Sequence, residues 1–435
     1  MIDATGFAER LLGLDGFTII DVEEGQSEVL VTVETTDSEA TCANCSSPAE
    51  AHDRRTIEVR DLPCFHRVAR LIWRKRRWRC RTVDCDTKTW TETSKHVPAR
   101  QLLTTRAGAE VCRQVGKLGR SVSSVADELG VCWSTAMAAV KHHGRPLVDD
   151  PRRVGKVRAL GIDETSWLKA TKDHATLYAT GLVDLDRKQM IDLVRGHSAR
   201  DLRRWCMGQD ENWLRGVKVV AMDLAESYRS GIDPYLSHAR TVADPFHVVR
   251  VGNRAVDQVR RRVQNETLGH RGRKDDPLYR IRKLLLSGAE RLDDRGHDRL
   301  LLGLRVGDPH DELLGAWLAK ESVRDVYLTD DPKEAAVLLD KTIVGCLEDS
   351  VPEIRSLGHT LKRWRKEILA HHRTGASNGP TEGLNLLVKK VKRCGHGFTS
   401  FDNYRLRVLL HTGGITWPTR PSPPRIRMRS PHSNA

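Results

Sequence analysis

The fold of this chain is decided by the stretch Val157-Arg158-Ala159-Leu160-Gly161-Ile162-Asp163-Glu164. Its residues are mostly apolar and are bounded by basic ones, which predicts a buried β-strand that ends on two adjacent carboxylates. An ionised carboxylate at the end of a core strand is unfavourable unless it is paired or bound to a metal. A strand that runs out into a loop would look the same, so this stretch alone leaves a structural and a catalytic interpretation open.

Two further carboxylates lie in matching settings downstream. Asp223 closes the apolar stretch 217–222, and Glu382 opens a helix after Ser377-Asn378-Gly379-Pro380. Two aspartates at strand ends and a glutamate on a late helix would together hold a pair of divalent metal ions, Mg²⁺ or Mn²⁺, for phosphoryl transfer.

Composition narrows the class of protein. The chain has 435 residues, enough for two to four domains, and its 72 Lys+Arg against 58 Asp+Glu give a net charge of +14. This charge favours a polyanionic partner, and nucleic acid is the partner we expect. No apolar run is long enough to span a membrane, the first 14 residues do not resemble a signal peptide, and the ten Cys suit a reducing compartment. We therefore expect a cytoplasmic protein, associated with the nucleoid when bound to DNA.

Residues 1–98 are predicted to form a zinc-binding β module. One predicted strand, Val29–Glu34, runs into Cys42 and Cys45, and a second, Leu71–Cys80, runs into Cys85. The spacings CxxC and CxxxxC at the ends of two strands fit a four-thiolate Zn²⁺ site. The alternative is two unrelated pairs of reduced Cys, and less regularly placed substitutes for the ligands are Cys64, His52 and His66.

The second of these strands is strongly basic. Its cations are interleaved with Trp73 and Trp78, and they are Arg74, Lys75, Arg76, Arg77 and Arg79. The pattern fits a solvated edge strand guarded by charge. It also fits a surface that binds the DNA backbone, which is the interpretation we favour.

Residues 99–148 are predicted to form a helix-turn-helix domain. The stretch Ser121–Val140 has the expected order: a short helix through Ala126 and Leu129, a turn at Gly130, and a second helix. Ser134 and Thr135 would lie near the start of that recognition helix, where DNA base edges are reached. Ordinary helical hairpins share this pattern, so the helix-turn-helix interpretation is strengthened only by the predicted zinc module that precedes it.

Residues 154–262 are predicted to form the first part of a catalytic core. Three consecutive strands with short connections, at about 157–164, 174–184 and 188–194, indicate an antiparallel meander. A helix over 198–214, the strand that Asp223 closes, a helix over 225–237, a strand ending on Asp244 and a helix from Phe246 follow. This order is that of the ribonuclease-H-like fold, in which the first and fourth strands are neighbours, so Asp163 and Asp223 would meet. The fold class is multidomain, α+β and α/β.

The remainder divides into three predicted segments. Residues 263–374 are expected to form a helical insertion, with breaks at 269–277, 307–309 and 330–332, and 415–435 a disordered, basic, Pro-rich tail. Residues 375–414 hold the last core helices. The first of these helices is predicted to start near Pro380, to place Glu382, Asn385, Lys389 and Arg393 on one face, and to pack through Leu384, Leu387, Val388 and Val391 on the other.

From about residue 40 to 412 the order of parts resembles insertion-sequence transposases of the ISL-three family. The matching motifs are the four Cys, Gly161-Ile162-Asp163-Glu164, Met222-Asp223-Leu224, Asp244-Pro245-Phe246-His247-Val248, Ser377–Asn385 and Gly395-His396-Gly397-Phe398. The resemblance implies cutting and joining of double-stranded DNA at the inverted ends of an element and in a target, by a homodimer or higher oligomer. It implies a catalytic triad of Asp163, Asp223 and Glu382.

The remaining polar residues near the triad are given supporting roles. We expect Asp244 and His247 to hydrogen-bond within the site, and Asn385, Lys389 and Arg393 to present an amide and two cations to phosphates. Asp244 also ends a strand, so it remains an alternative to Asp223. A hydrolytic nuclease on the same fold and a non-catalytic DNA-binding regulator are the rival functions.

Overall fold

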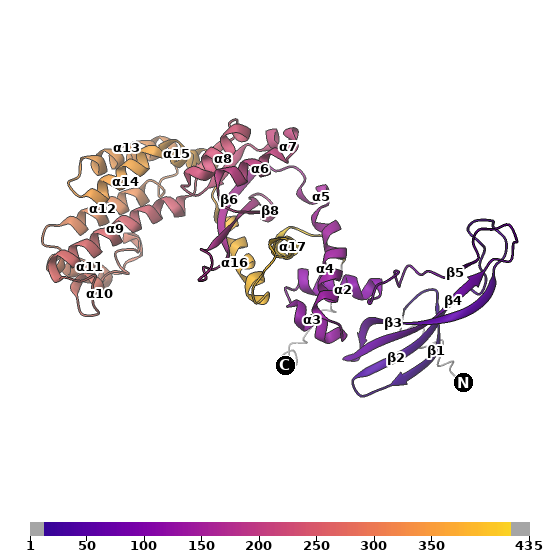
Figure 1. The fold of residues 1–435 in the computed structure, drawn as a ribbon. Coiled ribbons are helices and arrows are strands. Elements are labelled where there is room, and N and C mark those ends of the chain that lie inside the picture. Colours follow the sequence, from indigo (N-terminus) through magenta and orange to yellow (C-terminus); the bar gives the residue numbers. More distant parts are fainter. Residues whose placement is uncertain (1–12, 419–435) are drawn as a thin grey trace, which may run out of the picture. The chain divides into compact units, whose positions relative to one another are not determined.

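The computed structural model describes residues 13–418, which divide into two compact units (Figure 1). Unit 1 runs up to Arg153 and also includes Cys394–His396 and the chain from Leu406 on. Unit 2 comprises Val154–Arg393 and Gly397–Arg405. Most of the predicted tail, 415–435, lies outside the described residues. Across 13–418, none of the helices combines the length and apolar character needed to cross a bilayer.

A five-stranded sheet forms the first half of unit 1. Its strands are β1 (Phe17–Glu24), β2 (Glu28–Thr35), β3 (Glu50–Cys64), β4 (Arg67–Arg79) and β5 (Thr89–Thr91), in the order β1-β2-β4-β3 with β5 also paired to β4. Alternate residues of β2, such as Val31 and Val33, are buried, as the period of a half-buried strand requires. The strand β4 pairs with β3 along its length and, on its other side, with β2 as far as Trp73 and with β5 from Arg77 to Arg79, so the interpretation of an edge strand is wrong.

Helices form the second half of unit 1: α2 (Thr105–Gly116), α3 (Val122–Leu129) and α4 (Trp133–Val148), followed by the short α5 (Pro151–Val154). The side chain of Ser121 caps α3 by accepting from the Ser124 amide, and Gly130 ends it with φ of 62°, a left-handed conformation that glycine adopts without strain. Val140 on α4 is fully buried. The predicted pair of helices around Gly130 is confirmed, and α4 continues eight residues past the predicted stretch, to Val148.

Unit 2 is built on a mixed sheet. Its strands are β6 (Ala159–Leu168), β7 (Leu177–Asp184), β8 (Gln189–Arg195), β9 (Val219–Met222) and β10 (Arg240–Ala243), in the order β10-β9-β6-β7-β8. The first three strands are antiparallel, and β9 and β10 run parallel to β6. The predicted meander and the predicted pairing of the first and fourth strands are confirmed. However, β6 does not end at Asp163 and Glu164, because β7 pairs with it as far as Leu168.

Three helices pack beside this sheet: α6 (Ala199–Met207), α7 (Glu211–Gly216) and α8 (Glu226–Leu236) (Figure 1). Leu202 on α6 and Ile232 on α8 bury against Leu160 and Ile162 of β6 in one apolar core. The single helix predicted over 198–214 is wrong. It breaks because Asp210 accepts from the Trp213 amide and so caps a second helix.

A long helix, α9 (Pro245–Leu268), leads from the sheet into a helical region (Figure 1). That region contains α10 (Pro277–Arg280), a 3₁₀ turn (Ala289–Arg291), α11 (Asp294–Gly307), α12 (Glu312–Asp325), α13 (Pro332–Glu348), α14 (Pro352–Arg363) and α15 (Arg365–Thr374). Its helical character and all three predicted breaks are confirmed. The boundary predicted between residues 262 and 263 falls inside α9, because Val259 and Val263 continue one buried face.

Two helices complete the described chain, α16 (Gly379–Cys394) and α17 (Phe401–Thr412). The predicted start of α16 near Pro380 is confirmed, but its predicted faces need correction. Asn385 is buried, whereas Leu387 is exposed. The buried side of α16 is therefore formed by Thr381, Leu384, Asn385, Val388 and Val391.

Candidate functional site

The parallel pairing of β6 with β9 places Asp163 beside Asp223. The last paired residues are Ile162 and Met222, and each aspartate is the next residue along its strand. β9 ends at Met222, so the backbone of Asp223 leaves the sheet while Asp163 remains within β6. Asp163 is 8% exposed. The two carboxylates thus lie next to each other at the carboxyl end of β9, in a largely buried setting.

Asn378, a fully buried residue, ties the start of α16 to this sheet. Its backbone amide donates to Asp244 Oδ1 at 2.7 Å, and its side-chain Nδ2 donates to the carbonyl oxygen of Ile162 at 3.1 Å. The Thr381 hydroxyl in turn donates to Asn378 Oδ1 at 2.6 Å. These bonds hold the first turn of α16, which carries Glu382, against the strand that carries Asp163.

Gly161 allows this close approach. A Cβ atom at position 161 would lie 2.4 Å from Thr381 Oγ1 and 2.9 Å from Asn378 Oδ1. Both distances are well inside van der Waals contact, so any larger residue would displace α16 or β6. The glycine that precedes Ile162-Asp163 is therefore explained by packing against the helix that carries Glu382.

Burial and neighbouring negative charges change the pKa of Asp163. Burial, followed by the negative charge of Asp223, raises the pKa of the Asp163 carboxyl to about 7. Its Oδ1 accepts from the Glu164 amide at 2.7 Å, and its Oδ2 accepts from Asn385 Nδ2 at 2.5 Å. Asn385 therefore contacts the carboxylate directly and fixes its orientation.

His247, on the first turn of α9, lies between the other two carboxylates. Its Nδ1 is 2.9 Å from Asp223 Oδ2, and its Nε2 is 3.7 Å from Glu382 Oε1. Burial alone would lower the pKa of His247, but the hydrogen bond and charge of Asp223 raise it above the ordinary value. A protonated His247 would offset part of the repulsion between these carboxylates.

A pocket of about 620 Å³ opens over these groups. It is lined by all three predicted triad residues and by three cations, Arg250, Lys389 and Lys392. Lys392 donates to the carbonyl oxygen of Ser166 at 2.7 Å. Arg393 is exposed and is not among the lining residues, so its predicted place beside the site is wrong; α16 turns it away, and Lys392 stands there instead.

The acidic groups fit divalent cations. Among residues 13–418, Asp223 Oδ1 and Asp244 Oδ2 are buried oxygens without a hydrogen-bond donor. Carboxylate oxygens that lack a donor and repel one another are the ligands that hard cations such as Mg²⁺ take. A second set, Asp244, His247 and Glu382, brings one potential ligand atom from each residue within 4.8 Å of the others.

The geometry favours Asp223 over Asp244 as the partner of Asp163. Asp223 lines the pocket and contributes to the raised pKa of Asp163. Asp244 does not line the pocket, is 2% exposed, and uses one oxygen to hold the Asn378 amide. Its contact with Asn378 positions α16, which matches the supporting role predicted for it.

The four predicted zinc ligands form a separate cluster in unit 1. The Sγ atoms of Cys42, Cys45, Cys80 and Cys85 all lie within 4.8 Å of one another. The Cys42–Cys85 and Cys45–Cys80 Sγ distances are 3.7 and 3.5 Å, close to the separation of about 3.8 Å that a tetrahedral site with 2.3 Å Zn–S bonds requires. Hydrogen bonding with Ser47 and Thr82 lowers the pKa of the Cys45 thiol to about 5, which favours the thiolate that binds metal.

The basic strand β4 is less available to DNA than its sequence indicates. Arg76 points to Thr35 and Glu34, with hydrogen bonds to the Thr35 carbonyl and hydroxyl oxygens of 2.8 and 2.9 Å. Trp73 and Trp78 are buried, so the predicted surface aromatics belong to the interior. Arg74 and Arg77 form ion pairs with Glu34 and Asp53, and Lys75 lies over the Trp73 ring. Arg79 is exposed.

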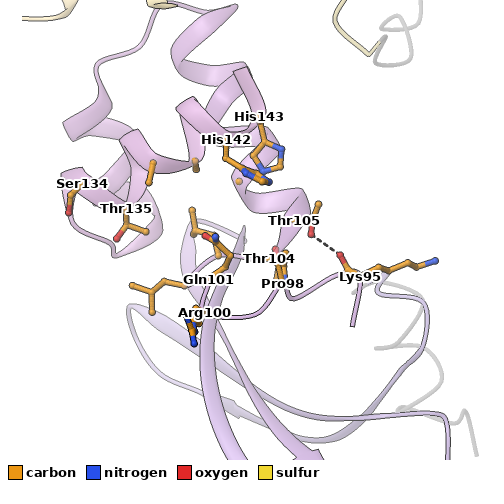
Figure 2. Close-up of a pocket in the computed structure, with 15 residues that line it drawn as sticks. Lys95, Pro98, Arg100, Gln101, Thr104, Thr105, Ser134, Thr135, His142 and His143 are labelled. Atoms are coloured by element: carbon orange, nitrogen blue, oxygen red, sulfur yellow. Dashed lines mark hydrogen bonds between the residues drawn. The ribbon is translucent and has the colours of Figure 1, made fainter. Parts of the chain in front are cut away.

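The start of α4, the predicted recognition helix, borders a pocket of about 500 Å³ (Figure 2). Ser134 and Thr135 lie on one side of it, and His142, two turns further along α4, also lines it. Lys95 and Arg100, from the segment that precedes α2, border the same pocket, and the Thr105 hydroxyl donates to the Lys95 carbonyl oxygen at 2.8 Å. The residues predicted to reach bases thus share a hollow with two further cations.

Family comparisons agree with both clusters. A family model described as a transposase matches residues 160–408, which is more than half of the chain and includes all three carboxylates of the predicted triad. A second model, described as the zinc-finger of transposase IS204/IS1001/IS1096/IS1165, matches residues 38–85 and includes the four Cys. The chain is therefore a transposase, and it belongs to the ISL3 family of transposases.

Individual relatives are insertion-sequence transposases. The chain is 25% identical over 376 residues to the transposase for insertion sequence element IS1001 of Bordetella parapertussis, which covers 84% of this chain and 87% of that protein. It is 27% identical over 303 residues to the transposase for IS1557 of Mycobacterium tuberculosis, covering 64% and 66%. Among solved structures, the Drosophila P element transposase strand transfer complex covers 72% of this chain and 92% of that chain at 10% identity, with a TM-score of 0.38.

Several residues of the site were not predicted. Asn378, Thr381 and Gly161 lie within motifs that the sequence analysis quoted, but their roles depend on the contact between α16 and β6. Arg250 and Lys392 were missed because each needs a helical register relative to the pocket. Phe246 was noted as the start of a helix and as part of a matching motif but was given no role, although it lines the pocket with 58% of its surface exposed.

Proposed function

We propose that unit 2 is a ribonuclease-H-like core that cuts and joins DNA by a DDE mechanism, with Asp163, Asp223 and Glu382 as the triad. The observation that carries the proposal is the pairing of Ile162 with Met222, which sets two aspartates side by side in a pocket that Glu382 also lines. The strand order β8-β7-β6-β9-β10, three antiparallel strands followed by two parallel ones, supports the fold assignment.

The three carboxylates would hold two divalent cations, Mg²⁺ or Mn²⁺. When bound, these ions would polarise the attacking and leaving oxygens and offset the negative charge that develops on the phosphate. Asn385 orients Asp163 through its hydrogen bond, and Asp244 together with Asn378 fixes the position of Glu382. Removing such supporting contacts from a metal site typically lowers metal affinity or activity about 10- to 100-fold.

Cleavage and joining are the same displacement with different nucleophiles. In cleavage, a water oxygen bonds to phosphorus, the bond from phosphorus to the 3′-oxygen breaks, and a 3′-hydroxyl and a 5′-phosphate result. In joining, that 3′-hydroxyl gives up its proton and its oxygen bonds to a target phosphorus, whose own 3′-oxygen leaves and takes up a proton. Lys389, Lys392 and Arg250 line the pocket where the phosphates would lie.

Unit 1 would recognise the inverted ends of the element. A structural Zn²⁺ on the four Cys would fix the loops of the first sheet, and α4 would present Ser134 and Thr135 to base edges. Lys95 and Arg100, which border the same pocket, would add contacts to phosphates. We also propose that a homodimer or higher oligomer assembles on the DNA, since two ends must be brought together.

The test is an assay of the purified full-length chain with Mg²⁺, a labelled duplex from the end of its element, and a target plasmid. Cleavage that exposes a 3′-hydroxyl, followed by joining to the plasmid, is expected, and Asp163→Asn should abolish both while end binding persists. Cutting without joining would indicate a hydrolytic nuclease. End binding without either reaction would indicate a regulator. Equal affinity for random DNA and for element ends at physiological salt would overturn the role given to unit 1.

A further inference from the structure

The rim of the carboxylate pocket carries a large exposed aromatic side chain. Phe246, the second residue of α9, lines the pocket beside His247 and Glu382, yet 58% of its surface is open to solvent. Its ring meets the His247 ring edge-on, with centroids 5.4 Å apart. Single exposed apolar residues are ordinary on protein surfaces. The position of this one beside the proposed scissile phosphate is what distinguishes it.

Two cations continue from Phe246 along the same face of α9. Arg250 and Arg254 follow at intervals of four residues, about 6 Å of helix each, and both are exposed. Within residues 13–418, neither has an ion pair or a hydrogen bond to another side chain, whereas Arg261, further along the helix, pairs with Asp257 at 2.6 Å. The face therefore presents an aromatic ring at the pocket and two unpaired guanidinium groups leading away from it.

We propose that this face of α9 binds one DNA strand, with Phe246 stacking on an unstacked base next to the scissile phosphate and with Arg250 and Arg254 holding the phosphates that follow. The inference rests on the proposed function, because it takes the pocket as the place of cleavage. A duplex must distort for a backbone phosphate to reach carboxylates inside a pocket. An aromatic ring at the rim can replace the stacking that the displaced base loses.

The side chains on this face of α9 indicate that its ligand is a nucleic acid strand. An aromatic ring accepts the face of any base, and guanidinium groups pair with phosphates. Lys389 and Lys392 of α16 also line the pocket and add positive charge, which suits a polyanion. Stacking on a ring and pairing with phosphates carry no base identity, so the proposed contact would be independent of sequence.

The test compares two substrates in single-turnover cleavage by the full-length chain. One is a fully paired end duplex, and the other carries a mismatch at the base pair next to the scissile phosphate. Phe246→Ala should cut the paired duplex about 5- to 150-fold more slowly, the range that loss of one base–aromatic stack gives. It should regain most of the wild-type rate on the mismatched duplex, and Phe246→Trp should cut both. Met207→Ala, at an apolar side chain of α6 that is 71% exposed, is the matched control and should change neither rate.

A second readout does not depend on activity. With Ca²⁺ in place of Mg²⁺ and 2-aminopurine at the flanking position, wild-type protein should raise the fluorescence of the base on binding, and Phe246→Ala should not. Arg250→Ala and Arg254→Ala should each reduce the salt slope of binding by about one. An equal rate loss of Phe246→Ala on both substrates would overturn the proposal. Wild-type protein that unstacks the base but never cuts would instead overturn the proposed function.

Discussion

The four-Cys cluster and the carboxylate cluster of this transposase are held in place by different kinds of structure. The thiols of the zinc cluster come from two short loops, and Cys45 and Cys80 are 35 positions apart. The carboxylate cluster is assembled from distant segments, and Asp163 is 222 positions from Asn385, whose side-chain amide orients it. Strand pairing and a buried asparagine hold the carboxylates in place before any metal binds. The thiols instead lie on two loops outside the strands, one before β3 and one after β4.

The difference indicates how binding of each metal ion would affect the stability of the fold. A loop-borne cluster needs its ion to fix the loops, so metal binding there is part of folding. A cluster held by a sheet and a helix is formed by the fold itself. Repulsion among its carboxylates therefore lowers the folding stability of the protein until a metal ion binds. The raised pKa of Asp163 is the physical sign of this second case.

The largest effect should come from removing a carboxylate of the sheet-borne cluster. Asp223→Asn should reduce cleavage and joining to background, because it removes a metal ligand and nothing that touches unit 1. Asp244→Asn should lower activity about 10- to 100-fold, since it loosens the hold on Asn378. Single-turnover cleavage rates of the two variants, with binding to element ends as the control, show which aspartate belongs to the triad. A near wild-type rate for Asp223→Asn with a dead Asp244→Asn would rewrite the triad as Asp163, Asp244 and Glu382.

Removing a thiol should instead unfold structure. Cys45→Ser should release Zn²⁺ and expose the amides of residues 42–91 to hydrogen exchange, while the strands of unit 2 stay protected. Cys206→Ser, at a buried thiol of α6 outside the cluster, is the matched control for zinc content. Freshly purified wild-type protein without zinc would contradict the assignment.

The pH dependence of stability should separate the clusters further. Because the folded-state pKa of Asp163 lies near 7 and its unfolded value near 3.8, the carboxyl destabilises metal-free protein progressively from about pH 4 to pH 7. Asp163→Asn should therefore stabilise metal-free unit 2, by up to about 4 kcal/mol at pH 8 and much less at pH 4. Thermal unfolding in a chelator measures this. A gain that does not grow with pH would show that the carboxyl ionises freely.

The smallest effect concerns the fit between strand and helix. Gly161→Ala should destabilise unit 2 by about 1–3 kcal/mol and slow cleavage, because the added methyl group meets Thr381 and Asn378. Gly181→Ala on the neighbouring strand is the matched control, since its added methyl group would lie 3.5 Å from Met190 Sδ, an ordinary contact. Equal behaviour of the two variants in denaturant unfolding and in cleavage would show that α16 is not held against Gly161.

The sequence predicted what depends on local spacing and on strand order. The four Cys were identified from CxxC and CxxxxC, and the adjacency of Asp163 and Asp223 followed from counting strands. What depends on side-chain direction was not predicted. Arg76 turns inward to Glu34, Arg393 turns away from the pocket, and Asn385 is buried, because each result depends on a register that only packing fixes.

The contact between Asp244 and Asn378 also bears on the synthesis of the chain. The two residues are 134 positions apart, separated by the whole helical region. At 5–20 residues per second, a ribosome needs roughly 7 to 27 s to pass from one to the other. During that time the nascent protein has both aspartates but not the residue that seats Glu382. Under the proposed mechanism, a transposase still being translated beside its own gene is therefore unable to cut it.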